Sequence, residues 1–60
     1  MKNIHIISIY DVWKVKNEVT GEDVWFAKYR FQAIRFAKRF KKIGYKIIVH
    51  NYDGSVNKII

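Results

Sequence analysis

The sequence contains no cysteine. This absence excludes a disulfide framework and a zinc site with thiolate ligands, so the chain depends on side-chain packing, or on a second copy of itself, for stability. Long apolar runs are also absent, since no stretch approaches the roughly 18 apolar residues of a membrane span. The apolar segment at residues 4–9 is short, is interrupted by His5 and Ser8, and precedes Asp11 without a small-residue cleavage site. We therefore expect no signal peptide and a cytoplasmic location.

Acidic residues are missing from one long part of the chain, residues 24–52. The five acids all lie outside it, and the formal net charge is +7 at pH 7. This asymmetry favours a polyanionic partner, with nucleic acid first and an acidic protein surface or an anionic membrane after it. The other interpretation is a solvated basic surface that only keeps the protein soluble.

Residues with the spacing of a catalytic or metal site are missing as well. His5 and His50 lie in expected strands without a partner at i+2 or i+4 and without a nearby carboxylate pattern, so they are interpreted as structural or surface histidines. The only serines, Ser8 and Ser55, show no nucleophile–base pairing. Gly54 follows Asp53 in a turn motif and is not part of a phosphate-binding loop. We expect a protein that is not an enzyme and that needs no cofactor and no metal ion.

The chain is rich in core-forming side chains, because half of its 60 residues are hydrophobic. A chain of this length forms a single domain, residues 1–60, and buries only about 60% of its unfolded surface, so each large apolar residue matters. Alternating or β-branched segments predict strands at the following positions: residues 4–10, 12–16, 24–28, 45–50 and 56–60. The first of these carries aliphatic side chains on both faces, so we expect it to be central or covered on both sides.

Alternation within the strands predicts which side chains are buried. Trp13 and Val15 are core candidates, whereas the lysines beside them face water. In residues 24–28 the pattern leaves open whether the pair with Trp25 or the pair with Phe26 faces inward. At least one bulky side chain is therefore expected on the outer surface of the sheet.

Residues 29–44, YRFQAIRFAKRFKKIG, are the only segment long and periodic enough for a helix that covers a small sheet. At 100° per residue, one stripe is expected to pack on the sheet: Tyr29, Ala33, Phe36, Ala37, Phe40 and Ile43. Gly44 is expected to be the left-handed C-cap, while no Ser, Thr, Asp or Asn is available as the N-cap. Together the elements predict an α+β fold: a small antiparallel sheet of four or five strands with one helix on one face, in the order ββ(β)αββ.

The helix has a second, basic face that also contains apolar residues. Opposite the core stripe lie Phe31, Arg35, Lys38 and Lys42, flanked by Ile34 and Lys41. An aromatic ring among cations is typical of a contact surface, where the ring stacks and the cations hold phosphates or carboxylates. The alternative is that Phe31 folds onto Trp25 or Tyr29 as a satellite of the core. The uncovered face of the sheet is a second candidate surface, for single-stranded nucleic acid or for a second protomer.

The order of these motifs resembles a known family. An isoleucine-rich strand, then VWKVK, then the helix leading directly into YKIIVHNYDGSVNKI, is similar to the small bacterial and phage family catalogued as domain of unknown function 2188. That family's pattern runs from a GW-x-V strand through an EA-x-x-x-A helix into a VVH-x-x-DG-x-I hairpin. The matching positions are Trp13, Val15, Ala33, Ala37, Val49, His50, Asp53, Gly54 and Val56.

Two positions depart from the family's pattern. Tyr29 stands where the family has a Thr before the helix, and Gln32 replaces its helix acid, which makes this chain more basic. The resemblance implies the fold and the absence of catalysis, and it implies no established activity.

We predict a small basic protein that binds nucleic acid through the cationic helix face and aromatic side chains of the sheet. The expected contact residues are Arg30, Phe31, Ile34, Arg35, Lys38, Arg39, Lys41, Lys42 and Trp25. The alternative is a protein-interaction module, either a homodimer or a binder of an acidic protein, with Phe31 and Ile34 as anchors and the cations as a rim. A membrane is not an expected partner.

Overall fold

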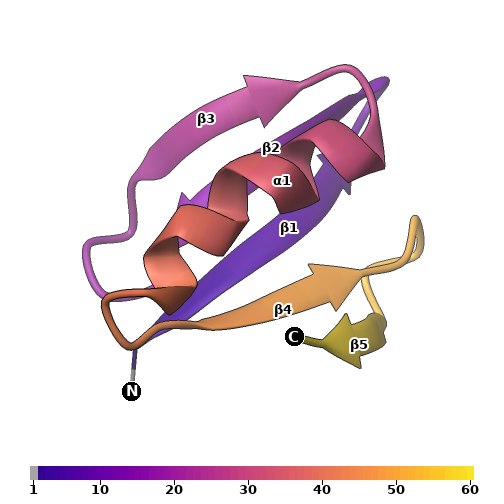
Figure 1. Ribbon diagram of the computed structural model, residues 1–60. Helices are drawn as coiled ribbons and strands as arrows, with labels where there is room; N and C mark the ends of the chain where they lie inside the picture. The colour runs from indigo at the N-terminus through magenta and orange to yellow at the C-terminus, as the bar shows by residue number, and fades with distance from the viewer. Residues whose placement is uncertain (1) are drawn as a thin grey trace.

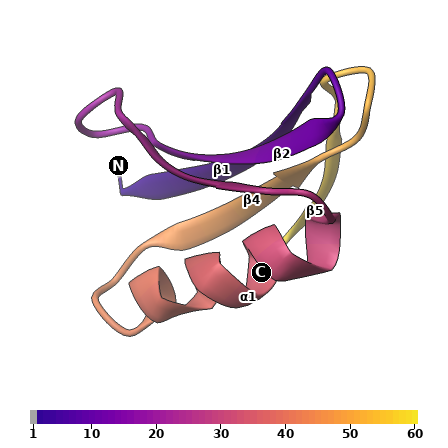
Figure 2. The same ribbon diagram turned by 90° about the horizontal axis from the view of Figure 1, so that it is seen from above.

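Within residues 2–60, which the computed structural model describes, five strands form one sheet and one helix lies across one of its faces (Figures 1 and 2). The elements are β1 (Asn3–Ile9), β2 (Val12–Asn17), β3 (Asp23–Ala27), α1 (Arg30–Lys41), β4 (Lys46–His50) and β5 (Val56–Ile59). The strands lie in the order β3-β2-β1-β4-β5, so β1 is central, as predicted. In the described part of the chain, no helix is long and apolar enough to cross a membrane.

The sheet is mixed, so the prediction of a wholly antiparallel sheet is wrong at one pairing, while the α+β class is confirmed. The β1–β2, β2–β3 and β4–β5 pairs are antiparallel, but β1 and β4 are parallel. Two antiparallel pairings in succession leave β3 running in the same direction as β1. The helix then returns the chain across the sheet, so β4 starts at the same end as β3 and pairs in parallel with the free edge of β1. Parallel neighbours require a crossover of this kind, which strand patterns do not reveal.

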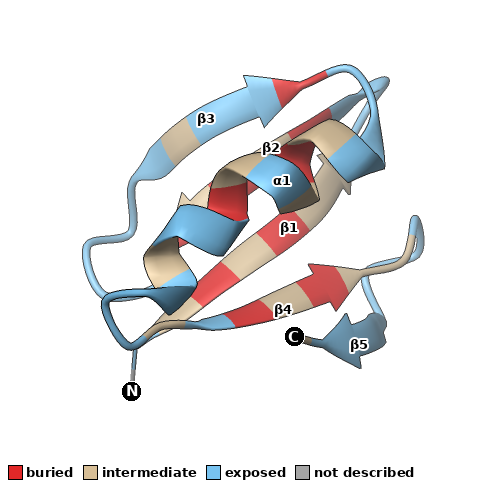
Figure 3. Cartoon of the chain, viewed as in Figure 1, coloured by how far each residue is buried: buried red, intermediate tan, exposed pale blue. Residues whose placement is uncertain are grey.

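The core lies between the sheet and the helix, as the buried positions in Figure 3 show. Its fully buried large side chains are Ile4, Ile6, Val15, Ile47 and Val49. Trp13 is 4% exposed, which confirms both core candidates of β2. Ala33 and Ala37 have no exposed surface and are the only fully buried residues of α1, because small side chains let the helix approach the strands closely.

Residues directly before and after the helix form the hydrogen bonds that cap its two ends. Tyr29 has an extended N-cap backbone, and its N–H donates to Oε1 of Gln32 at 3.4 Å, which is one half of a capping box. At the other end, the N–H of Tyr45 donates to the carbonyl of Phe40 and the N–H of Gly44 to that of Lys41, each at 3.1 Å. These two bonds form a Schellman motif, and φ of 94° at Gly44 confirms the predicted left-handed C-cap.

The predicted core stripe of the helix is wrong at both ends. Tyr29 is 50% and Ile43 is 60% exposed, because α1 spans only Arg30–Lys41 and both residues lie outside it. Ile34, expected on the outer face, is half-buried and packs against the core. With Ala33 and Ala37 at the centre of the contact, the apolar face extends on one side to Ile34 and on the other to Phe36.

Candidate nucleic-acid interface

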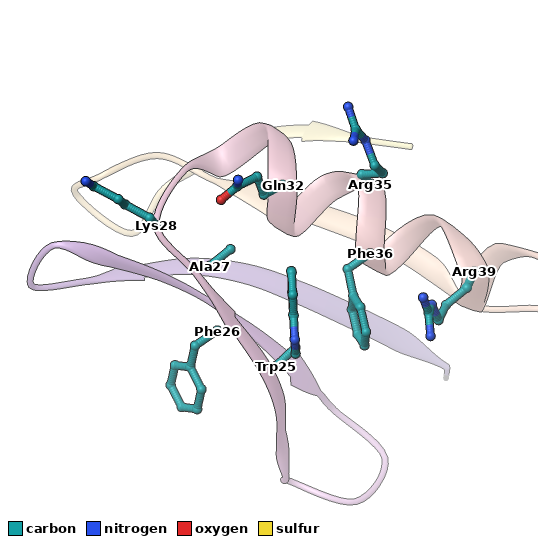
Figure 4. Close-up of a pocket in the computed structure, with 8 residues that line it drawn as sticks. All are labelled: Trp25, Phe26, Ala27, Lys28, Gln32, Arg35, Phe36 and Arg39. Atoms are coloured by element: carbon teal, nitrogen blue, oxygen red, sulfur yellow. The ribbon is translucent and has the colours of Figure 1, made fainter.

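A groove of about 510 Å³ lies between the edge strand β3 and the helix (Figure 4). Its walls are Trp25, Phe26, Ala27, Lys28, Gln32, Arg35, Phe36 and Arg39. Because β3 is at the edge of the sheet, the groove is bordered by one strand and one helix and remains open at the surface.

The register of β3 decides the face that the sequence left open. Val15 and Trp13 face the core, and they pair with Trp25 and Ala27 respectively, so these two side chains also point toward the helix. Phe26 pairs with Lys14 and points to the other face. Ala27 is buried, whereas Trp25 stays 40% exposed at the groove.

Trp25 is the outer member of a three-layer stack. Its ring lies nearly parallel to that of Phe36, at 15° and with centroids 4.6 Å apart. Arg39 lies one helical turn after Phe36, and its guanidinium is over the Phe36 ring, 4.3 Å from the ring centroid (Figure 4). This Trp25–Phe36–Arg39 stack holds an aromatic surface and a cation in fixed relation to each other.

The charge of the groove is not neutralised within the protein. Within residues 2–60 the ion pairs join His5 to Glu18 and Lys14 to Asp23, so neither includes Lys28, Arg35 or Arg39. Among residues 2–60, no carboxylate lines the groove. The Nζ of Lys28 lies 5.5 Å from the Tyr29 ring centroid and the guanidinium carbon of Arg35 lies 5.9 Å from that of Phe31. Cations held over rings but lacking a counter-charge are available to an anionic ligand.

The structure brings some of the predicted contact residues together and leaves others apart. Trp25, Arg35 and Arg39 line the groove. The remaining cations are outside it: Lys38, Lys41 and Lys42 are exposed on the helix and its last turn, and Arg30 lies over the Trp13 ring. Ile34 belongs to the edge of the core.

Phe31 combines the two interpretations offered for it. Its ring stacks on that of Tyr29, with centroids 5.8 Å apart and planes at 16°, yet it remains 58% exposed. It therefore rests on a neighbouring ring, as the satellite interpretation predicts, and still presents an apolar surface beside the cations.

Five groove residues were not predicted as contacts: Phe26, Ala27, Lys28, Gln32 and Phe36. Phe36 was assigned to the core, where it is half-buried, and its spacing of three from Arg39 was the signal that could have placed it beside a cation. No pattern in the sequence marked Lys28 and Gln32 as groove residues, because the groove exists only where β3 lies beside the helix.

A second polar feature lies on the face of the sheet away from the helix. Nδ1 of His5 is 2.9 Å from Nε2 of His50. His5 also contacts Glu18, Nε2 to Oε1 at 2.7 Å, and Nδ1 of His50 is 3.0 Å from the carbonyl oxygen of Gly54. The hydrogen bond from His5, followed by that from Asn3, lowers the pKa of Glu18 below its ordinary value. Among residues 2–60, no three His, Cys, Asp or Glu side chains are grouped so that they could hold a metal ion.

The same face carries exposed apolar side chains. The strand pairings place them on one face, with Phe26 and Ile59 on opposite edge strands, and those at least one-third exposed are Ile9, Val12, Phe26, Val56 and Ile59. No element of residues 2–60 covers them (Figure 2). Lys14 and Lys16 on this face are partly exposed and Lys46 is exposed, while Lys14 contacts Asp23 at 3.5 Å, so this face contains a carboxylate beside a cation, which the groove does not.

Comparison with family models, curated proteins and solved structures finds no match to this chain. The resemblance to domain of unknown function 2188 therefore stays a prediction from the motifs.

Proposed function

We propose that this chain is a non-enzymatic nucleic-acid-binding protein and that the groove between β3 and α1 is its binding site. The observation that carries the proposal is the set of cations Lys28, Arg35 and Arg39, without carboxylate partners, around an exposed tryptophan. Lysine and arginine bind phosphates by displacing condensed counterions, and an aromatic ring offers a face to a base. The exposed Lys38, Lys41 and Lys42 extend the positive field along the helix. A cytoplasmic location, which the sequence predicts, is where such a ligand is available.

A salt series tests this proposal. Fluorescence anisotropy of labelled DNA and RNA oligonucleotides should show binding that weakens as salt rises. Replacing Lys28 and Arg35 together with Gln should lower the slope of log K against log salt by about 1.4, at about 0.7 for each single-strand phosphate contact. Lys58→Gln, on β5 at the opposite edge of the sheet, is the matched control and should leave binding almost unchanged. The absence of salt-dependent binding to any oligonucleotide at low ionic strength would overturn the proposal.

The second candidate function is self-association through the face of the sheet away from the helix. The observation that favours it is the exposed apolar group on that face, with Phe26 54% and Ile59 61% exposed. A second copy would bury this surface, and small domains often gain stability in this way. Sedimentation over a wide concentration range should then detect a dimer that Ile59→Lys disrupts, whereas a concentration-independent monomer would rule the candidate out. An acidic protein bound at the groove is the remaining alternative, and competition with oligonucleotide would identify it.

A further inference from the structure

We infer that the groove takes an unpaired nucleotide, whose base stacks on the open side of Trp25 while Lys28 and Arg35 hold the adjoining phosphates. The ligand is then single-stranded nucleic acid and not a duplex. This inference rests on the proposed function, because it names the form of nucleic acid that the same groove recognises.

The first step is the stacking platform. Phe36 occupies one side of the Trp25 ring, and the Arg39 guanidinium lies behind Phe36. On the other side Figure 4 shows Ala27 and Lys28, and Ala27 has only a methyl group to fill the space. One face of the Trp25 ring thus packs on Phe36, and the other face is accessible, which agrees with the 40% exposure of Trp25. A base stacked there would become the fourth layer of the Trp25–Phe36–Arg39 stack.

The second step is the arrangement of polar groups around that platform. Lys28 directly follows β3 and Arg35 lies on α1, and both line the groove. In Figure 4 their charged ends extend away from Trp25, toward the rim of the groove, where the phosphates on either side of a stacked base would lie. Gln32 lies between them along the helix wall, and its Oε1 is used by the N–H of Tyr29. Its amide NH₂ has no partner among residues 2–60 and is available as a donor to a base edge.

The third step is the choice between strand forms. In a duplex, each base face is covered by its neighbours, so a protein ring reaches a base face only when that base is unpaired and unstacked. A groove of about 510 Å³ has the capacity of a small-ligand site, which suits one nucleotide. The exposed Trp25 ring in this groove therefore favours an extruded or single-stranded base.

The test compares four ligands of equal length: single-stranded dT12, single-stranded rU12, the dT12·dA12 duplex, and an abasic 12-mer that keeps the phosphates but has no bases. Anisotropy gives affinities, and tryptophan fluorescence reports stacking. The single strands should bind more tightly than the duplex and the abasic strand, and they should quench the signal of Trp25.

Trp25→Ala should weaken binding of dT12 about 5- to 150-fold, the effect of one lost base–aromatic stack, while the salt slope stays the same. Trp25→Phe, which keeps packing against Phe36, should lose less affinity and abolish the ligand-dependent quenching, because the remaining Trp13 is buried. Tyr10→Ala is the matched control, since it removes a 95% exposed ring at the β1–β2 turn. If Trp25→Ala does not fold, the ligand-dependent quenching of wild-type Trp25 fluorescence and the affinity of Trp25→Phe still test the inference.

The outcomes separate the inference from the function on which it rests. Equal, salt-dependent binding of all four ligands, unaffected by Trp25→Phe, would overturn the unpaired-base inference and leave nucleic-acid binding in place. Absence of salt-dependent binding to every ligand would overturn both. Tighter binding of the single strands, together with weaker binding by Trp25→Ala, supports both the unpaired-base inference and nucleic-acid binding.

Discussion

Nδ1 of His5 lies 2.9 Å from Nε2 of His50, although the two residues are 45 positions apart in the chain. The outer nitrogens of the pair meet groups that accept hydrogen bonds: the Glu18 carboxylate and the Gly54 carbonyl. Both outer nitrogens must therefore carry a hydrogen. The two inner nitrogens then face each other and need one further proton between them. All three hydrogen bonds are formed only when the pair holds three protons and one positive charge.

This geometry predicts three protonated ring nitrogens in the His5–His50 pair when all three contacts are formed. Nitrogen-15 NMR of the imidazoles counts the protonated nitrogens directly. Two protonated nitrogens in a pair that keeps all three contacts would contradict the count.

The Glu18 carboxylate should make folding stability depend on acid pH. Its pKa is lowered from 4.5 in the folded chain, so the folded state favours the ionised form. The stabilisation is therefore present above about pH 4.5, the ordinary value, and is lost as pH falls through the folded pKa. Urea midpoints of wild type and Glu18→Gln should differ at pH 7 and converge near pH 2. Glu22→Gln, in the same loop but without an ion pair in residues 2–60, should follow the wild type at both pH values.

Replacing Gly44 should destabilise the protein because of its backbone conformation and not because of steric crowding. Its φ is 94°, and an added Cβ would meet nothing within 4 Å, so only conformation opposes a side chain. We expect Gly44→Ala to lower the free energy of unfolding by about 1 kcal/mol, as a Schellman motif requires a left-handed residue. Gly44→Asn should cost less, because Asn tolerates this region. Equal stability of wild type and Gly44→Ala in urea unfolding would contradict the assignment.

Replacing Ile34 with Ala should lower the free energy of unfolding more than replacing Phe31 with Ala. Ile34 packs against the core, so Ile34→Ala should lower the free energy of unfolding by about 1–3 kcal/mol, less than a fully buried isoleucine. Phe31 is 58% exposed, stacks on Tyr29 and lies beside the Arg35 guanidinium, so Phe31→Ala should change stability by about 0.5 kcal/mol. Thermal unfolding of both variants compares them directly. A larger loss from Phe31→Ala would show that the core extends over the outer helix face.

Much of the fold follows from patterns between near neighbours. Alternation correctly predicted that Trp13 and Val15 are buried. The aliphatic side chains on both faces of β1 predicted its central position, and Gly44 predicted the end of the helical region. Each of these depends on side-chain direction or on φ over a few residues, which local order specifies.

The candidate site depends on contacts that local order does not specify. Trp25 was a predicted contact residue, but its position beside Phe36 required the register of β3 against β2. Of the predicted cations, only Arg35 and Arg39 line the groove, while Lys28 joins them because β3 ends beside the helix.

The amino-acid order was thus sufficient for the strands, the helix, their sequence along the chain and the concentration of positive charge, since periodicity and composition act locally. The parallel pairing of β1 with β4, the inward turn of Ile34, the groove and the His5–His50 contact arise only when α1 crosses the sheet. The reason is that the rotation of the helix is set by how closely Ala33 and Ala37 approach the strands, and this packing selects the side chains that meet across the fold.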